Sequence, residues 1–197
     1  MKKLLLGLAV TTLFTAPAFA ALKVGDTAPD FSATASLGGK EFNFKLNEAL
    51  KKGPAVVYFY PSAYTGGCDL EAHTFAENAA KFDAAGATII GVSADNMERL
   101  NQFAADPNFC AGKFPIASDE SLKIAQSYNL ETTPAKTGAK DVRGVEIGHG
   151  FIERVTFVVG KDHKIVAVMS SKQDKLSPDQ HVEKSLEMVQ KMKMASK

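Results

Sequence analysis

One stretch of the chain, residues 58–75, constrains the fold and the chemistry more than any other. An apolar run rich in β-branched and aromatic residues ends at Pro61, a loop with two glycines follows, and Cys68 is expected to open an amphipathic helix. A thiol at a helix start faces unpaired backbone N–H groups and the positive end of the helix dipole, which both favour the thiolate. Cys68 is therefore a candidate nucleophile, although an arbitrary free cysteine is more often buried and inert.

The same stretch carries a family motif. Pro61, Thr65 and Cys68 match the P-x-x-x-T-x-x-C signature of peroxiredoxins, and Glu71 lies where the family usually has Glu or Gln. The segments VGDTAPDF, VVYFYP, GVSAD and ERVTFVV continue the similarity over nearly the whole chain that follows the first 20 residues. The chain thus resembles the AhpC/TSA superfamily, and within it the bacterioferritin-comigratory, or Q-type, branch.

Two departures from that branch are local. Gly66 stands where the branch often has Pro, and His73 stands where many members carry a second cysteine. The resemblance implies a thioredoxin-like fold and a thiol peroxidase that reduces hydrogen peroxide or organic hydroperoxides.

The resemblance also implies roles for individual residues. Cys68 would attack the peroxide, Thr65 would position it through its hydroxyl, and Pro61 would shield the pocket from water. Arg154, in the segment ERVTFVV, matches the family arginine that stabilises the thiolate. Without the resemblance, an arginine flanked by Glu153 at a strand edge would be interpreted as part of a solvated surface pair.

Cys110 is the only other cysteine of the sequence. Oxidation of Cys68 by peroxide gives a sulfenic acid, which another thiol must resolve before further oxidation. By analogy with related members, Cys110 is the candidate resolving thiol, and a thioredoxin-fold dithiol protein is the expected reductant. Cys110 as a bystander, or a structural disulfide between the two cysteines, stays open as an alternative.

The N-terminal segment has the features of a secretory signal peptide. Lys2 and Lys3 precede an apolar run too short to span a bilayer, and Ala18-Phe19-Ala20 fits an A-x-A cleavage site. We therefore expect cleavage after Ala20 and a periplasmic protein, with an uncleaved membrane anchor as the weaker alternative.

The remaining residues, 21–197, have the length of one domain. Two of the 23 basic residues leave with the signal peptide, so the formal net charge changes from +1 to −1. The near-zero net charge and the lack of a basic patch interleaved with aromatic residues give no sign of nucleic-acid binding. No later apolar run is long enough to cross a membrane. The scattered histidines form no metal motif, so we expect no metal or other cofactor, and a monomer or homodimer.

Alternating strand and helix patterns predict a three-layer α/β/α domain with a mixed central sheet. Strands are expected at 41–44, 55–60, 87–92, 114–116, 151–159 and 164–168, the last two as a hairpin. Helices are expected to begin at Cys68, after Asp95, after Ser118 or Asp119, and at Pro178.

Two of these helices carry capping patterns, and one long segment has no assigned structure. Asp95 with Glu98, and Ser177 with Gln180, fit capping boxes. Residues 131–150 form a connection longer than is usual, either a functional lid or a flexible excursion.

Two other functions are alternatives to the peroxidase. A disulfide oxidoreductase would require C-x-x-C, which the sequence lacks. A non-enzymatic redox sensor or binding module with a structural disulfide is the alternative from another class. Peroxide consumption with a dithiol donor separates them, because only a peroxidase turns over.

Overall fold

The structure is a computed structural model that describes residues 21–195, so the expected signal peptide at residues 1–20 lies outside the described part. Its centre is a seven-stranded mixed sheet with the strand order β2-β1-β5-β4-β3-β8-β9. These strands are β1 (Ser32–Leu37), β2 (Lys40–Lys45), β3 (Ala55–Phe59), β4 (Thr88–Ser93), β5 (Ile116–Ser118), β8 (Val155–Val159) and β9 (Ile165–Ser170). β3 and β5 each pair in parallel with β4, and the other neighbours pair antiparallel.

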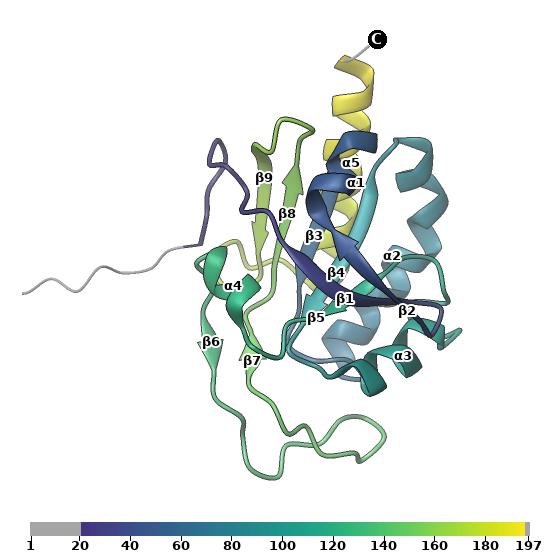
Figure 1. The fold of residues 1–197 in the computed structure, drawn as a ribbon, viewed down its shortest axis with the longest axis vertical. Coiled ribbons are helices and arrows are strands. Elements are labelled where there is room, and N and C mark those ends of the chain that lie inside the picture. Colours follow the sequence, from purple (N-terminus) through teal and green to yellow (C-terminus); the bar gives the residue numbers. More distant parts are fainter. Residues whose placement is uncertain (1–20, 196–197) are drawn as a thin grey trace, which may run out of the picture.

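Helices cover both faces of this sheet, as Figure 1 shows. They are α1 (Leu46–Lys52), α2 (Gly66–Ala84), α3 (Met97–Ala105), α4 (Lys123–Ser127) and α5 (Pro178–Ala195). Alternate side chains of the buried strand β3 enter two separate hydrophobic cores: Val57 and Phe59 pack with α1 and α4, whereas Val56 and Tyr58 pack with α2, α3 and α5. The three-layer α/β/α architecture with a thioredoxin-like mixed sheet is therefore confirmed.

Several elements differ from the sequence prediction. The strand expected at 151–159 is two strands, β7 (Phe151–Ile152) and β8, because Glu153 and Arg154 interrupt it. The strand expected at 114–116 lies two residues later, as β5. β1 and α1 were not predicted at all.

The capping box at Asp95 is also wrong. Asn96 is the N-cap of α3, and its side chain accepts a hydrogen bond from the Arg99 backbone N–H at 2.9 Å. The Asp95 carboxylate instead accepts from the Ala63 N–H at 2.8 Å. By contrast, Gln180 Oε1 accepts from the Ser177 N–H at 3.0 Å, as the second capping box predicts.

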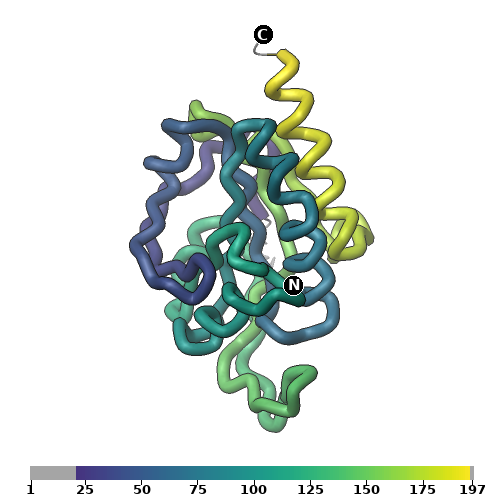
Figure 2. The backbone as a smooth tube through the Cα atoms, turned by 90° about the vertical axis from the view of Figure 1, so that its right-hand side faces the viewer, coloured from purple at the N-terminus to yellow at the C-terminus, as the bar shows by residue number. Residues whose placement is uncertain are grey.

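The long connection forms an excursion, residues 134–150, that projects from one end of the sheet (Figures 1 and 2). Its two ends are joined by the small antiparallel pair of β6 (Thr132–Thr133) and β7. Within residues 21–195, no helix is both long and apolar enough for a membrane span.

Candidate active site

Cys68 lies at the beginning of α2, directly after the loop that follows β3. The helix starts at Gly66, two residues earlier than predicted, and the Cys68 N–H donates to Thr65 O at 2.8 Å. The Cys68 amide is therefore already paired. The side chain is 2% exposed, so the sulfur lies in a nearly dry environment.

Arg154 supplies the positive charge that faces this sulfur. It precedes β8, at the interruption between β7 and β8, and β8 lies next to β3 in the sheet. Its Nη2 donates to Cys68 Sγ at 3.1 Å, and its Nη1 donates to Glu71 Oε2. Only 10% of the Arg154 side chain is exposed, so water screens this contact weakly.

Gly67 makes space for the approach of Arg154. A Cβ atom at this position would lie 3.3 Å from Arg154 Nη2 and 3.4 Å from Cγ of Pro178, the first residue of α5. These contacts are tighter than ordinary packing, so the absent side chain lets the guanidinium and the start of α5 close over the first turn of α2.

Burial raises the pKa of the Cys68 thiol, because a desolvated thiolate is disfavoured. The Arg154 charge and hydrogen bonds from Thr65 and from the Ser62 backbone act in the opposite direction, and the carboxylate of Glu71 adds to the rise. The net direction is opposite to the one that a helix start alone predicts. Among the groups that favour the thiolate, Arg154 has the largest effect.

Thr65 and Pro61 lie on the loop that leads to Cys68. The Thr65 hydroxyl donates to Ser62 O at 2.8 Å and can rotate toward a substrate oxygen. Pro61 is half-buried directly after β3. The sequence-predicted Pro61, Thr65, Cys68 and Arg154 therefore belong to one region of the structure, where the β3–α2 loop meets the start of β8.

The excursion is bonded to this loop at several points. Asp95 Oδ1 accepts from Ser62 Oγ at 2.8 Å and lies 2.7 Å from His149 Nε2. The Val142 N–H donates to Tyr64 O at 3.0 Å, and the guanidinium carbon of Arg143 lies 3.3 Å from the centroid of the Tyr64 ring. The sequence did not predict these contacts, since they join positions far apart in the chain.

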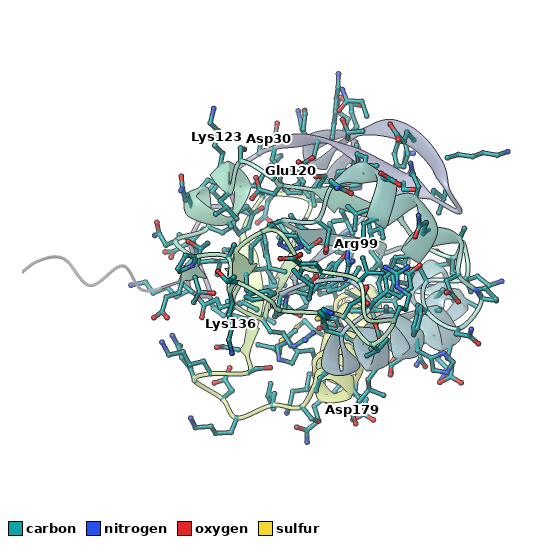
Figure 3. The ribbon with its side chains drawn as sticks, turned by 90° about the horizontal axis from the view of Figure 1, so that it is seen from below. Asp30, Arg99, Glu120, Lys123, Lys136 and Asp179 are labelled. Atoms are coloured by element: carbon teal, nitrogen blue, oxygen red, sulfur yellow. The ribbon has the colours of Figure 1, made fainter. Side chains whose placement is uncertain are left out.

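An ion-pair network fixes the middle of the same excursion. Arg99 Nη2 lies 2.8 Å from Asp141 Oδ2 and donates to Ala63 O at 2.7 Å. Arg143 Nη2 lies 2.8 Å from the same Asp141 oxygen. Figure 3, a view from below, labels Arg99 near the middle of the molecule. Its bonds to Asp141 and Ala63 connect the excursion to the Cys68 loop. Both arginines are thus engaged with Asp141.

Cys110 lies apart from the Arg154 cation. It is fully buried and, like Cys68, is a free thiol. Burial raises its pKa well above the usual range, and the acidic side chains of Asp106 and Asp69 raise it further. Cys110 therefore stays protonated at neutral pH.

One buried histidine behind Cys68 was missed by the sequence prediction. His181, from α5, is fully buried with Nδ1 2.9 Å from Thr156 Oγ1 and 4.0 Å from Glu71 Oε1. Its position could not be read from spacing, because α5 and β8 meet α2 only in the folded chain. Within residues 21–195, no three or more His, Cys, Asp or Glu side chains are grouped to hold a metal ion.

Residues 24–168 match the model of the AhpC/TSA family. The chain belongs to this family and is a peroxiredoxin-type thiol peroxidase, which is the class that the fold and a thiol facing a guanidinium had indicated.

Individual relatives place the chain near the Bcp and Q-type members. It is 30% identical to peroxiredoxin Bcp of Escherichia coli (strain K12), over 73% of this chain and 83% of the relative. It is 29% identical to the chloroplastic peroxiredoxin Q of Sedum lineare, over 89% of this chain and 82% of the relative. The crystal structure of peroxidoxin BcpB from Mycobacterium tuberculosis superposes with a TM-score of 0.68 at 28% identity, covering 85% of this chain and 96% of that one.

Proposed function

We propose that this protein reduces hydrogen peroxide and organic hydroperoxides through Cys68. The observation that carries the proposal is the 3.1 Å hydrogen bond from Arg154 Nη2 to Cys68 Sγ. An arginine stays charged at any physiological pH, so it stabilises the thiolate without competing for its proton. The same guanidinium is positioned to stabilise charge on a peroxide bound at the sulfur.

The chemical step follows from these positions. The Cys68 thiolate attacks one peroxide oxygen, a sulfur–oxygen bond forms, and the oxygen–oxygen bond breaks. The second oxygen leaves as hydroxide or alkoxide and takes up a proton, and Cys68 becomes a sulfenic acid. In this step Arg154 and the Thr65 hydroxyl hold the peroxide, and Pro61 limits the access of water.

Cys110 is the proposed resolving thiol. Its attack on the Cys68 sulfenic acid would form a disulfide and release water, and a thioredoxin-fold dithiol protein would then reduce that disulfide. Both thiols belong to the same hydrophobic core, which also contains the stacked rings of Tyr58 and Tyr60, 5.4 Å apart. The two sulfurs are not bonded, and bonding needs Cα atoms within about 7 Å. Because Cys68 lies in the first turn of α2 whereas Cys110 follows another helix, α3, we propose that resolution requires local opening of the first turn of α2 and of the segment around Cys110.

Hydrogen exchange tests this opening directly. We expect faster amide exchange at residues 66–72 and 107–113 in the disulfide form than in the reduced form, because those segments must leave their packed positions. The remainder of α2 and the strands of the central sheet serve as internal references. Equal protection in both redox states would show that Cys110 resolves Cys68 without rearrangement or does not resolve it.

A steady-state assay tests the peroxidase itself. The protein is mixed with hydrogen peroxide or an alkyl hydroperoxide and an excess of a dithiol reductant, and peroxide is followed over many equivalents. Continued consumption supports the enzyme. Consumption of one equivalent only would favour the redox-sensor alternative, and no consumption would overturn the proposal.

Export is proposed separately, on the sequence of residues 1–20. The basic start, the short apolar run and the A-x-A site support cleavage after Ala20 and a periplasmic location for residues 21–197 as one domain. Mass spectrometry of the protein from fractionated cells gives the test. An intact Met1 in the cytoplasmic fraction would contradict export.

A further inference from the structure

A chain of buried polar groups extends from the reactive sulfur into the interior. Arg154 bonds both Cys68 Sγ and Glu71 Oε2, and Glu71 Oε1 lies 4.0 Å from His181 Nδ1. Glu71 and His181 are both fully buried, and Glu71 Oε1 has no hydrogen-bond partner. An ionised carboxylate oxygen without a partner in a dry interior is unfavourable, so this atom requires an explanation.

The hydrogen bonds of His181 identify which of its ring nitrogens carries the hydrogen. Ser171 Oγ donates its hydrogen to Leu176 O at 2.9 Å, so it can only accept from His181 Nε2, which lies 3.0 Å away. A neutral His181 therefore has its hydrogen on Nε2, and its Nδ1 carries a lone pair that accepts from the Thr156 hydroxyl. An unprotonated Glu71 Oε1 would thus face the lone pair of another acceptor.

Charge leads to the same conclusion. If Cys68 is a thiolate and Glu71 is ionised, the buried group of Cys68, Arg154 and Glu71 carries a net charge of −1. If either Cys68 or Glu71 holds a proton, the net charge is zero. A low-dielectric interior favours the neutral total, so the thiolate and the carboxylate compete for one proton.

We propose that Glu71 is protonated on Oε1 when Cys68 is a thiolate, and that the lone pair of His181 Nδ1, 4.0 Å away, favours this form by disfavouring negative charge on Oε1, so that His181 is a positioning residue for the reactive sulfur. This inference rests on the proposed function of Cys68 as the peroxide-reactive thiolate. It gives the α5 helix a role in the chemistry, although α5 supplies no group in contact with the sulfur. Protonation on Oε1 also leaves Oε2 free to accept from Arg154, whose full charge then acts on Cys68.

The titration behaviour of the two groups agrees with this geometry. Burial raises the pKa of Glu71 to about 7 against the opposing effect of Arg154, so a proton is available there at neutral pH. Burial and then the Arg154 charge lower the pKa of His181 to about 4, so His181 stays neutral and can accept.

Two further titratable groups face this site. Asp174, from the segment before α5, opposes the fall in the pKa of His181. Tyr58, from β3, lies near Glu71, and burial is the largest cause that keeps its pKa far above neutral. Tyr58 therefore supplies no proton at neutral pH.

Infrared spectroscopy combined with thiolate absorbance tests the proposal on the unmodified protein. At neutral pH we expect the ultraviolet absorbance of the Cys68 thiolate together with the carbonyl stretch of one buried protonated carboxylic acid. Glu71→Gln should remove that stretch. Cys68→Ser should also remove it, because a neutral serine leaves the Arg154 charge to Glu71, which then ionises.

Substitutions at His181 test the positioning role. His181→Leu removes the lone pair that faces Glu71 Oε1, so Glu71 should ionise more readily and raise the Cys68 pKa by up to about one unit. His181→Asn, whose amide oxygen can take the place of Nδ1, should restore most of the shift. Glu71→Gln should lower the Cys68 pKa by roughly one unit or more, because it removes a competing negative charge. His73→Gln, at an exposed histidine on the same helix as Glu71, is the matched control and should change nothing.

The double variant gives the sharpest comparison. If His181 acts through Glu71, His181→Leu should leave the Cys68 pKa unchanged in a Glu71→Gln background. An equal shift in both backgrounds overturns the positioning role. Thiolate absorbance and peroxide turnover without any carboxylic acid stretch overturn the shared proton but leave the peroxidase intact, whereas absent turnover counts against the proposed function itself.

Discussion

The two cysteines of this protein are equally buried and differ in the charge that each one faces. Cys68 is 2% exposed and Cys110 is fully buried. Burial raises the pKa of both thiols, but Arg154 opposes the rise at Cys68, whereas Asp106 and Asp69 add to it at Cys110. Burial alone therefore does not decide whether a cysteine is reactive. The sign of the nearest charge does.

The two thiols also differ in how their segments are held. The loop before Cys68 is fixed by buried side-chain bonds, above all from Asp95 to Ser62 and Ala63. The segment around Cys110 is held by backbone turns and by aromatic contacts such as Phe103 with Phe109, 5.1 Å between ring centroids. We therefore expect the segment around Cys110 to open at lower free energy than the loop before Cys68.

The largest effect is expected from Cys68→Ser. A serine hydroxyl is close in size to a thiol but is not ionised at neutral pH, so peroxide turnover should be lost while the fold is kept. Steady-state peroxide consumption and circular dichroism measure both. Retained turnover in a folded variant would mean that Cys68 is not the reactive sulfur.

Arg154→Met should have the next largest effect. The variant keeps the length of the side chain but removes the charge, so the Cys68 pKa should rise. Losing one preorganised donor typically slows the chemical step by about 100-fold to 1,000-fold. Stopped-flow measurement of the peroxide step gives the rate constant.

Arg143→Met is the matched control for Arg154→Met. Arg143 pairs with Asp141 and stacks on Tyr64, whereas Arg154 bonds the sulfur itself, so this variant should change the rate constant much less. If Arg143→Met or Arg99→Met reduced the rate more than Arg154→Met, the catalytic cation would lie elsewhere.

Cys110→Ser should distinguish the peroxide step, which we assign to Cys68, from the resolving step, which we assign to Cys110. The first equivalent of peroxide should react at nearly the wild-type rate, because Arg154 and Cys68 are untouched. Turnover with a thioredoxin-type donor should then stall as Cys68 accumulates as sulfenic or sulfinic acid. Mass spectrometry of the stalled protein identifies the oxidation state, and undiminished turnover would make Cys110 a bystander.

His149→Gln should have the smallest effect, and mainly on the Cys68 side. Asp95 raises the pKa of His149 against the opposing effect of burial, so this ion pair stabilises the fold below the ordinary His pKa of 6.5. Burial raises the pKa of Asp95, but the hydrogen bonds that its carboxylate accepts, above all the one from His149, lower it by more. The ionised Asp95 therefore stabilises the fold at pH values above its ordinary pKa of 3.8. The wild type should exceed the variant in unfolding free energy by about 1 kcal/mol between roughly pH 4 and 6.5, since the His149 side chain is partly exposed.

That difference should shrink as the pH rises through the raised pKa of His149, and as it falls through the lowered pKa of Asp95. Denaturant unfolding at several pH values measures it. Hydrogen exchange should quicken at residues 62–65 but not at 106–113. An equal increase in the exchange rate of both segments would show that the two thiols are not held differently.

The strands and helices with strong periodicity were predictable from the sequence. The run before Pro61 became β3, and the Ser177 and Gln180 pattern correctly located the start of α5, because each signal depends on neighbouring residues. β1 escaped prediction since its residues, SATASL, are mostly small and carry little apolar pattern. The capping box at Asp95 was predicted wrongly because an Asp three residues before Glu98 fits the capping pattern. The Asp95 carboxylate instead accepts hydrogen bonds from the Cys68 loop.

The site was predictable only in part. Pro61, Thr65 and Cys68 follow from a local motif, and Arg154 was assigned from a resemblance rather than from spacing. The contacts of His181 with Thr156 and of His149 with Asp95 carried no signal, because they join residues 25 and 54 positions apart in the chain. The direction of the Cys68 pKa was mispredicted for the same reason, since burial is set by the whole fold.

The contact between Arg154 and Cys68 spans 86 positions of the chain, and the bond between Asp95 and His149 spans 54. Contacts of this sequence separation require large loops to close and are generally formed late in folding. During synthesis, the ribosome releases Cys68 well before Arg154 has been added. On the proposed role of Cys68 and Arg154, we expect the nascent chain to carry an ordinary, poorly ionised thiol that becomes reactive toward peroxide only when β8 docks beside β3, which would protect the cysteine from oxidation until the fold is complete.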